Sequence, residues 1–272
     1  MRGLQLYIYF AVVVIVLIIS IKYNNTENLH LCNLTNKLTL DDVPKNIIMV
    51  VTGEITPFVA ENIESLKAKN KNWKLHLYRD MDIEPFIYQH YNSDVVTVYK
   101  SINPLYGAAR ADFFRYLALY ALGGVYLDSK SSCEYPLDET VLSGDVDIIL
   151  WNSGHRFPNI HCECSPHPQD EFCNWVLIAP QHSPLIKQVI DDVIYNLRNK
   201  NGSGWDILKI TGPHQFTSSI CSLLTQYKWS MRNEKQSGFV YCRDEDEYRR
   251  QNKSIRRKHW SELKEPIILA NV

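Results

Sequence analysis

The sequence has almost no excess of charge of either sign. It holds 29 Lys and Arg against 30 Asp and Glu, which gives a net charge of −1. A nucleic-acid-binding domain needs a basic surface, so this balance argues against DNA or RNA as a partner. The basic run at residues 249–258 follows an acidic run at 244–247 and predicts a solvent-exposed charged helix. Internal repeats are also absent from the sequence, which argues against a solenoid.

Long hydrophobic runs are equally scarce, with one exception at the N-terminus. Residues 4–21 are apolar apart from Gln5 and Ser20, and such a run is long enough to cross a bilayer as a helix. No small-residue cleavage site closes it, which favours an uncleaved signal anchor over a signal peptide. We expect a type II membrane protein of the Golgi or endoplasmic reticulum. Its parts are a tail and anchor (1–22), a stem (23–43) and a lumenal domain (44–272).

The seven cysteines all follow this apolar run, where disulfides can form in an oxidising lumen. Because seven is odd, at least one thiol is free or pairs with another chain. The segment 154–173 combines three cysteines with three histidines, but Cys162-x-Cys164 lacks the second close pair of a common zinc site. We interpret this segment as a disulfide-linked loop on the acceptor side of a site.

The remaining chain alternates strand and helix patterns, which predicts an α/β fold. The β-branched run 45–52 fits a buried parallel strand, 57–69 an amphipathic helix and 73–78 a second strand. Residues 80–91 suggest a short acidic loop and helix. Later segments predict further strands and helices, listed here: strands at 147–151 and 175–179, and helices at 183–197 and 215–227.

The most informative segment is 107–130, with the sequence GAARADFFRYLALYALGGVYLDSK. On a helix, Asp112 and Arg115 share one face with Ala108 and Leu119. A Gly-Gly pair ends the helix, and a short apolar strand then leads into Asp128. On spacing alone, the Asp–Arg pair can be a surface ion pair or part of a ligand site. In α/β folds, ligands bind at the carboxyl ends of strands, where Asp128 is expected.

This segment resembles glycosyltransferase family 32, whose sugar-binding region contains a DXD motif, and more remotely the glucosyltransferase domains of large clostridial toxins. The shared pattern is Ala-Ala-x-x-Asp-x-x-Arg-Tyr followed by Gly-Gly-x-Tyr-x-Asp-x-Asp. The chain matches it up to Asp128, but Lys130 stands where the second acid belongs. The segment 174–186, the Thr211-Gly212-Pro213 turn and the pair His259-Trp260 also resemble family elements, in the same order.

The resemblance implies a GT-A-type, Rossmann-like fold that binds a nucleotide-sugar donor. It implies that Asp128 and Lys130 are catalytic. It assigns the following residues to the donor sugar or nucleotide: Val51, Thr52, Ala108, Asp112, Arg115, Tyr126, Thr211, Gly212, His214, His259 and Trp260.

Lys130 leaves open whether the site binds a metal ion, because in the family the second acid binds Mn²⁺ or Mg²⁺ directly. A hard divalent cation prefers oxygen ligands, so Lys130 cannot be a ligand of such a metal ion. Three readings remain. Lys130 supplies the positive charge on the diphosphate itself, or Asp128 holds a metal with Glu134 or Asp138, or the site binds without catalysing.

The expected activity is retaining transfer of a hexose (mannose, galactose or glucose) to a glycan, glycoprotein or glycolipid hydroxyl. No residue stands out from the sequence as a nucleophile, so we expect front-side transfer. The alternative is a catalytically inactive protein of GT-A fold that binds a glycan or a nucleotide-sugar.

Overall fold

The computed structural model describes residues 42–140, 148–158, 160–163, 165, 167–232, 237–254 and 258–269, all within one compact unit that spans residues 39–272. The first half alternates strands and helices: β1 (Asn46–Val51), α2 (Pro57–Lys69), β2 (Lys74–Arg79), α3 (Asp80–His90), α4 (Ser93–Ser101), α5 (Gly107–Leu122) and β3 (Gly124–Leu127).

The second half is more irregular and carries two small sheets. Its elements are β4 (Ser132–Cys133), α6 (Leu137–Thr140), β5 (Ile148–Arg156), β6 (Asp170–Phe172), β7 (Val176–Ala179), α7 (Pro184–Asn199), η2 (Gly204–Asp206), α8 (Ile207–Ile210), α9 (Pro213–Cys221), η3 (Leu224–Gln226), β8 (Trp229–Arg232), β9 (Phe239–Val240), α11 (Glu245–Ser254) and η4 (Trp260–Glu262).

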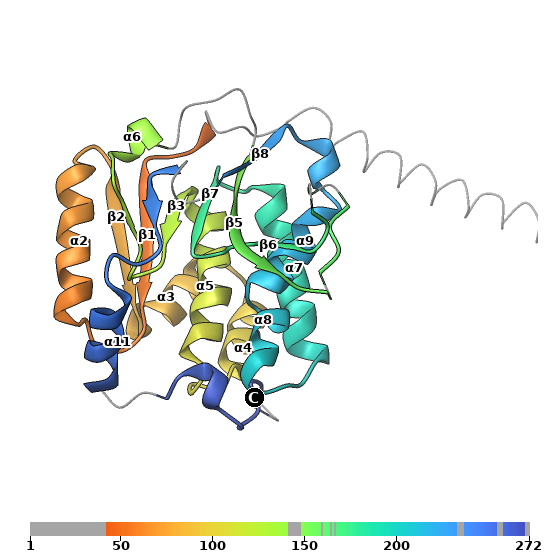
Figure 1. Cartoon of the computed structure of the whole chain (residues 1–272). Helices are drawn as coiled ribbons and strands as arrows, with labels where there is room; N and C mark the ends of the chain where they lie inside the picture. Colours follow the sequence, from red (N-terminus) through yellow and green to blue (C-terminus); the bar gives the residue numbers. More distant parts are fainter. Residues whose placement is uncertain are drawn as a thin grey trace, which may run out of the picture. The chain divides into compact units, whose positions relative to one another are not determined.

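The main sheet has the strand order β2-β1-β3-β7 (Figure 1). β1 runs parallel to β2 and β3, whereas β7 pairs with β3 in the antiparallel sense. The sheet β6-β5-β8 lies beyond β7, and the pair β4-β9 forms a third sheet. The predicted α/β fold is therefore present, with its parallel core built from the first half of the chain.

Helices cover both faces of the main sheet. Because alternate side chains of β1 point to opposite faces, they pack in two separate core clusters. Ile48 and Val50 belong to the core cluster built with α3, α5 and α7. Met49, by contrast, packs in a second cluster with residues of α2. A strand buried on both faces is typical of a parallel core, and it explains the continuous apolar run of β1.

The junction between α5 and β3 needs two glycines. Gly123 and Gly124 both have positive φ, +63° and +118°. A Cβ on Gly124 would lie 2.3 Å from the carbonyl oxygen of Asn46 in β1. The missing side chain lets β3 start directly against β1. The position of this start also fixes where β3 ends, just before Asp128.

Most predicted elements have the observed bounds to within two residues, but the strand predicted over 147–151 continues to Arg156 and one helix is shorter. The helix predicted over 215–227 ends at Cys221, after which the chain continues through turns into η3. The apolar pattern runs on through Leu223 and Leu224, so it does not reveal where the helix stops. None of the helices within the described ranges is long and apolar enough to span a membrane. The predicted anchor and nearly all of the stem lie outside those ranges.

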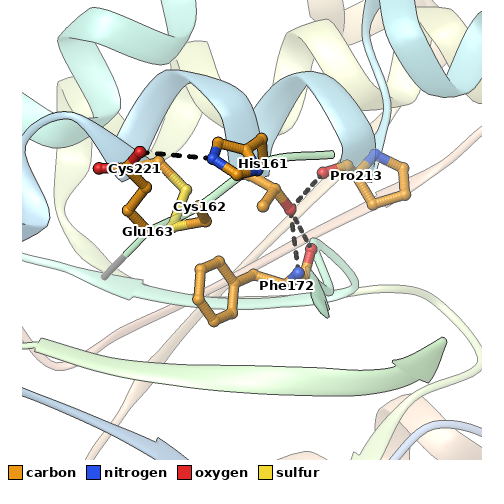
Figure 2. Close-up of a disulfide and its surroundings, with 7 residues drawn as sticks. His161, Cys162, Glu163, Phe172, Pro213 and Cys221 are labelled. Carbon is orange, nitrogen blue, oxygen red and sulfur yellow. Dashed lines mark hydrogen bonds and ion pairs between the residues drawn. A yellow bond between two sulfur atoms is a disulfide. The ribbon is translucent and has the colours of Figure 1, made fainter. Parts of the chain in front are cut away.

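A disulfide joins the loop after β5 to α9, between Cys162 and Cys221 (Figure 2). The two cysteines are 59 residues apart in sequence. Next to this bond, the Thr217 hydroxyl bridges β6 and α9, because it accepts from the Phe172 N–H at 2.9 Å and donates to the Pro213 carbonyl at 2.8 Å. The predicted disulfide-linked loop is therefore present, tied to a distant helix.

Candidate functional site

A cleft of about 1460 Å³ opens where β1 and β3 end. Its walls come from segments far apart in sequence. The lining residues used below are Val51, Thr52, Ala108, Asp112, Arg115, Tyr126, Asp128, Lys130, Asn152, Gly154, Glu171, Asn174, Tyr241, Tyr248, His259 and Trp260. The position matches the general rule that ligands bind at the carboxyl ends of strands in α/β sheets.

The Asp112–Arg115 pair of α5 is buried in the floor of this cleft. Arg115 Nη2 lies 2.9 Å from Asp112 Oδ1, and the two side chains are 6% and 10% exposed. The interpretation as a solvent-exposed ion pair on a helix is therefore wrong. Two buried charges cost free energy to desolvate and need several partners to be tolerated.

Arg115 is the centre of the charge cluster. The same Nη2 lies 3.2 Å from Asp128 Oδ1, and Nη1 donates to the carbonyl of Asn174 at 2.5 Å. The guanidinium also lies 4.8 Å from the centroid of the Tyr126 ring. Although burial alone lowers the pKa of Arg115, Asp128 and the other neighbouring groups raise it above its ordinary value. The cluster therefore contains a permanent cation between two carboxyl groups.

Asp112 is held from three sides. Besides Arg115, it accepts from the Asn174 side-chain amide at 3.2 Å and from the Thr211 hydroxyl at 3.1 Å. Burial raises the pKa of Asp112 to about 6, against the opposing effect of Arg115. The carboxyl group is thus ionised at neutral pH and becomes protonated in mild acid.

Asp128 follows β3 directly, as predicted. The Tyr126 hydroxyl donates to Asp128 Oδ1 at 2.9 Å, the oxygen that also faces Arg115. Burial raises the pKa of Tyr126 well above its ordinary value, so this hydroxyl stays a donor. These contacts fix the Asp128 side chain at the edge of the cleft.

Lys130 lies in an aromatic pocket two residues further on. Its Nζ donates to the Tyr241 hydroxyl, and it lies 3.8 Å from the Tyr241 ring centroid and 5.4 Å from that of Tyr248. Burial works against the charge of Lys130, yet Tyr241 and Asp128 raise its pKa above the ordinary value. The group is therefore an ammonium ion at neutral pH, held on the faces of two rings.

The donor set around Asp128 does not fit a hard divalent cation. An ammonium group occupies the position of the second acid, and Asp128 Oδ1 already faces Arg115 and Tyr126. Within the described ranges, no three His, Cys, Asp or Glu side chains converge as a metal site. Asp138 is bound elsewhere, to Lys45 at 2.9 Å and to the Trp73 indole N–H at 3.0 Å, and Glu134 is exposed outside the cleft lining.

The end of β1, with Val51 and Thr52, forms another wall of the cleft. The chain turns at Gly53, which has φ +85°. Its N–H donates to Asp80 Oδ2 at 2.7 Å, and its carbonyl accepts from Arg79 Nη2 at 2.6 Å. The backbone of this wall is thus fixed by the last residue of β2 and the first residue of α3.

The other predicted donor residues separate into two groups. His259 and Trp260 line the cleft, where the Trp260 ring packs edge-on against Trp205 at 5.0 Å between centroids. Thr211, Gly212 and His214 lie behind the lining. Thr211 supports Asp112 from there, and His214 faces Glu171.

Several residues of the cleft were not predicted as site residues, among them Asn174, Tyr241, Tyr248 and Glu171. Asn174 is the first residue of the segment 174–186 that resembles the family, and this was the one available signal for it. Tyr241 and Tyr248 lie in stretches whose sequence carries no motif, whereas Glu171 lies in the segment 154–173, which was interpreted as a loop on the acceptor side. Only the folded chain brings them to Lys130 and to the cleft wall.

Two sequence comparisons bear on this site. The family described as "Glycosyltransferase sugar-binding region containing DXD motif" matches residues 36–150, which include α5, β3 and Lys130. The chain is also 29% identical over 174 residues to the "Initiation-specific alpha-1,6-mannosyltransferase" of Candida albicans. That match covers 56% of the chain and 44% of the relative, so the chain spans less than half of the relative's length.

Solved structures show a similar fold at low sequence identity. The "PaToxG Glycosyltransferase" superposes with a TM-score of 0.50 and 17% identity, covering 67% of the chain and 70% of that structure. The "UDP-bound glycosyltransferase domain from the YGT toxin" gives a TM-score of 0.50 and 9% identity, with 78% and 82% covered. The fold is thus that of glycosyltransferase domains. Together with the sequence matches, it supports a glycosyltransferase.

Proposed function

We propose that the chain transfers a hexose from a nucleotide-sugar to a hydroxyl group of a glycan, with mannose as the first sugar to test. The observation that carries the proposal is the buried Asp112–Arg115–Asp128 cluster in a cleft at the strand ends, with the Lys130 ammonium beside it. Mannose ranks first because the sequence relative is named a mannosyltransferase. Galactose and glucose remain in the same panel.

Asp112 and Arg115 hold the donor sugar. An ionised carboxylate accepts hydrogen bonds from sugar hydroxyls, and a guanidinium donates to hydroxyl or phosphate oxygens. Because Arg115 is fixed by three protein groups, its direction is set before the donor arrives. Such preorganised polar groups stabilise a transition state without further reorganisation.

Lys130 neutralises the departing diphosphate in place of a metal ion. A lysine binds phosphate as a point charge, and this one carries its charge at neutral pH. The Tyr241 hydroxyl and ring hold the ammonium beside Asp128. We therefore favour the metal-free reading over a metal shared with Glu134 or Asp138.

Transfer proceeds on one face of the sugar, with retention at the anomeric carbon. The bond from that carbon to the diphosphate oxygen breaks, and the acceptor oxygen forms its bond on the same side. The acceptor proton passes to the leaving phosphate oxygen, so no protein base is required. Catalysis then consists of positioning and charge stabilisation.

The cellular setting completes the proposal. Residues 4–21 anchor the chain in a Golgi or endoplasmic reticulum membrane, and the domain faces the lumen. The acceptor is a glycan, a glycoprotein or a glycolipid. The disulfide between Cys162 and Cys221 agrees with an oxidising compartment.

A panel of nucleotide-sugars tests the proposal, with sugar release and sugar transfer measured in excess chelator and again with Mn²⁺ or Mg²⁺. We expect one donor to be turned over equally in both conditions. Lys130→Met is expected to lose about 100- to 1000-fold in kcat, as when one charge-stabilising group is removed from other enzymes. The matched control is Lys187→Met on α7, where the lysine pairs with Asp191 on the surface.

Three results would contradict the proposal in different ways. Strict dependence on Mn²⁺ would remove the metal-free role of Lys130. Full activity of Asp128→Asn would mean that the active site lies elsewhere in the chain. Tight binding of a nucleotide-sugar without turnover of any donor would indicate a binding protein instead of an enzyme.

A further inference from the structure

A carboxyl–imidazole pair lies at the cleft wall and has no part in the donor site above. Glu171 of β6 lines the cleft, and His214 lies behind it at the start of α9. Their nearest atoms, Glu171 Oε2 and His214 Nε2, are 3.0 Å apart, and the side chains are only 8% and 6% exposed.

His214 is short of hydrogen-bond partners. The contact has the distance of an ion pair but not the alignment of a hydrogen bond, and neither ring nitrogen of His214 has a hydrogen-bond partner among the described residues. Phe157 covers the imidazole ring at 4.3 Å between centroids. A carboxylate this deeply buried needs donors, since desolvation penalises its charge. Glu171 lines the cleft, from which a ligand hydroxyl can supply one.

The order of the strands separates this pair from the donor wall. β1, with Val51 and Thr52, lies on one side of β3 and Asp128, whereas β7 lies on the other. The sheet that contains β5 and β6 lies further out beyond β7 (Figure 1). Glu171 is therefore across the Asp112–Arg115–Asp128 cluster from the proposed nucleotide wall.

The cleft has room beside Glu171. Gly154 of the neighbouring strand β5 also lines the cleft, and a Cβ built on it meets no atom within 4 Å. Asn152, two residues earlier, lines the same wall, where its Oδ1 accepts from the Gly154 N–H at 2.6 Å and its Nδ2 donates to Met231 Sδ at 3.5 Å. One amide N–H and one oxygen lone pair are left for a ligand. A carboxylate and an amide beside open space are the groups that bind sugar hydroxyls.

We propose that Glu171 binds a hydroxyl group of the acceptor glycan, and that His214 holds its carboxylate in position. The inference rests on the proposed transferase function and adds the acceptor side of the same cleft. His214, assigned to the donor by its motif, is then a positioning residue on the acceptor side.

The test separates donor chemistry from acceptor binding. Hydrolysis of the nucleotide-sugar without acceptor reports the donor site, and transfer to methyl α-mannoside or α-1,6-mannobiose reports the acceptor site. We expect Glu171→Gln to raise the KM of the acceptor about 10- to 100-fold, the usual worth of a hydrogen bond to a charged group. Donor hydrolysis should stay within about twofold of wild type.

His214 and a surface pair supply the controls. His214→Phe should raise the acceptor KM in the same direction, and His214→Gln, which keeps a donor, should recover most of it. The matched control is Glu163→Gln in the loop after β5. There a His161–Glu163 pair lies 3.4 Å apart with side chains 71% and 85% exposed (Figure 2), and we expect no effect on either assay.

Each other outcome is decisive. If Glu171→Gln lowers donor hydrolysis as much as transfer, Glu171 acts at the donor and the proposal is wrong. If neither assay changes, the pair is structural. Should wild type turn over no nucleotide-sugar, the proposed function fails, but saturation-transfer NMR with the same mannosides still tests the acceptor site. The acceptor proposal is supported if wild type binds the mannosides and both Glu171→Gln and the charge-preserving but shorter Glu171→Asp lose this binding. It is overturned if wild type does not bind them, or if the two variants bind them as wild type does.

Discussion

Replacing Arg115 by methionine tests whether the cleft floor is held together by charge. The substitution keeps much of the side-chain volume but leaves Asp112 and Asp128 without their shared cation. Because both Oδ1 atoms lie within 2.9 and 3.2 Å of the same nitrogen, they are at most about 6 Å apart. Two unit charges at that distance repel by about 3 kcal/mol at an effective dielectric constant of 20.

This estimate agrees with the usual cost of removing one partner from a buried ion pair, about 3–5 kcal/mol. We therefore expect Arg115→Met to lower the free energy of unfolding by about 3–5 kcal/mol at pH 7.5, measured by urea denaturation. Losing the carbonyl contact to Asn174 adds to the effect.

The pH dependence identifies the origin of the loss. The pKa of Asp112 is already raised to about 6 by burial, and removing Arg115 raises it further. An acid whose pKa is higher in the folded state stabilises the fold at low pH and loses that contribution as the pH rises. At pH 5.0 Asp112 is mainly protonated in both proteins, so the difference between them should shrink.

Asp112→Asn provides the internal control, because it removes one of the two charges. The double variant Arg115→Met with Asp112→Asn should recover part of the stability at pH 7.5. Arg115→Lys should lose less than Arg115→Met, since it keeps the charge with fewer donors. An equal loss at both pH values, together with no recovery in the double variant, would mean that packing and not charge determines the cost.

Two further predictions concern the donor site and the fold. Donor hydrolysis should fall as the pH drops through about 6, because protonation removes the negative charge with which Asp112 binds Arg115 and a sugar hydroxyl. An ordinary aspartate would keep its charge to about pH 4, and a pH profile that is flat between 7 and 5 would contradict this prediction. Gly124→Ala should lower the free energy of unfolding by about 3 kcal/mol or more, measured by thermal or urea denaturation, because the added Cβ meets the β1 backbone and φ is +118°. Gly154→Ala, where φ is +78° and the Cβ meets open space, should cost only about 1 kcal/mol. Equal losses in the two variants would refute the steric argument.

Local signals in the sequence were sufficient for the elements that carry the donor side. The helix α2 has the predicted bounds because Pro57 opens it and the Thr56 hydroxyl accepts from Val59 N–H at 3.4 Å. The position of Asp128 follows from the apolar strand that ends just before it. These features depend on neighbours in sequence, so periodicity and capping residues reveal them.

Contacts between distant segments were not predictable in the same way. The seven cysteines do not indicate that Cys162 pairs with Cys221, because pairing depends on where α9 packs. The Asp112–Arg115 spacing is the same on an exposed helix as on a buried one. Burial is decided by β3 and by the Asn174 segment, which cover this face of α5.

The environment of Lys130 shows why the departure from the family motif is more than the loss of an acid. A buried lysine beside few partners normally loses its charge, because desolvation lowers its pKa. Here Tyr241, at the end of β9, and Tyr248, in α11, bring two aromatic faces and one hydroxyl to the ammonium. The same segment is tied to the strand end, since the Ser131 hydroxyl donates to the Tyr241 carbonyl at 2.9 Å. Residues more than a hundred positions away in the sequence thus stabilise the ammonium at the cleft, which supports the role proposed above for Lys130 as the charge on the diphosphate.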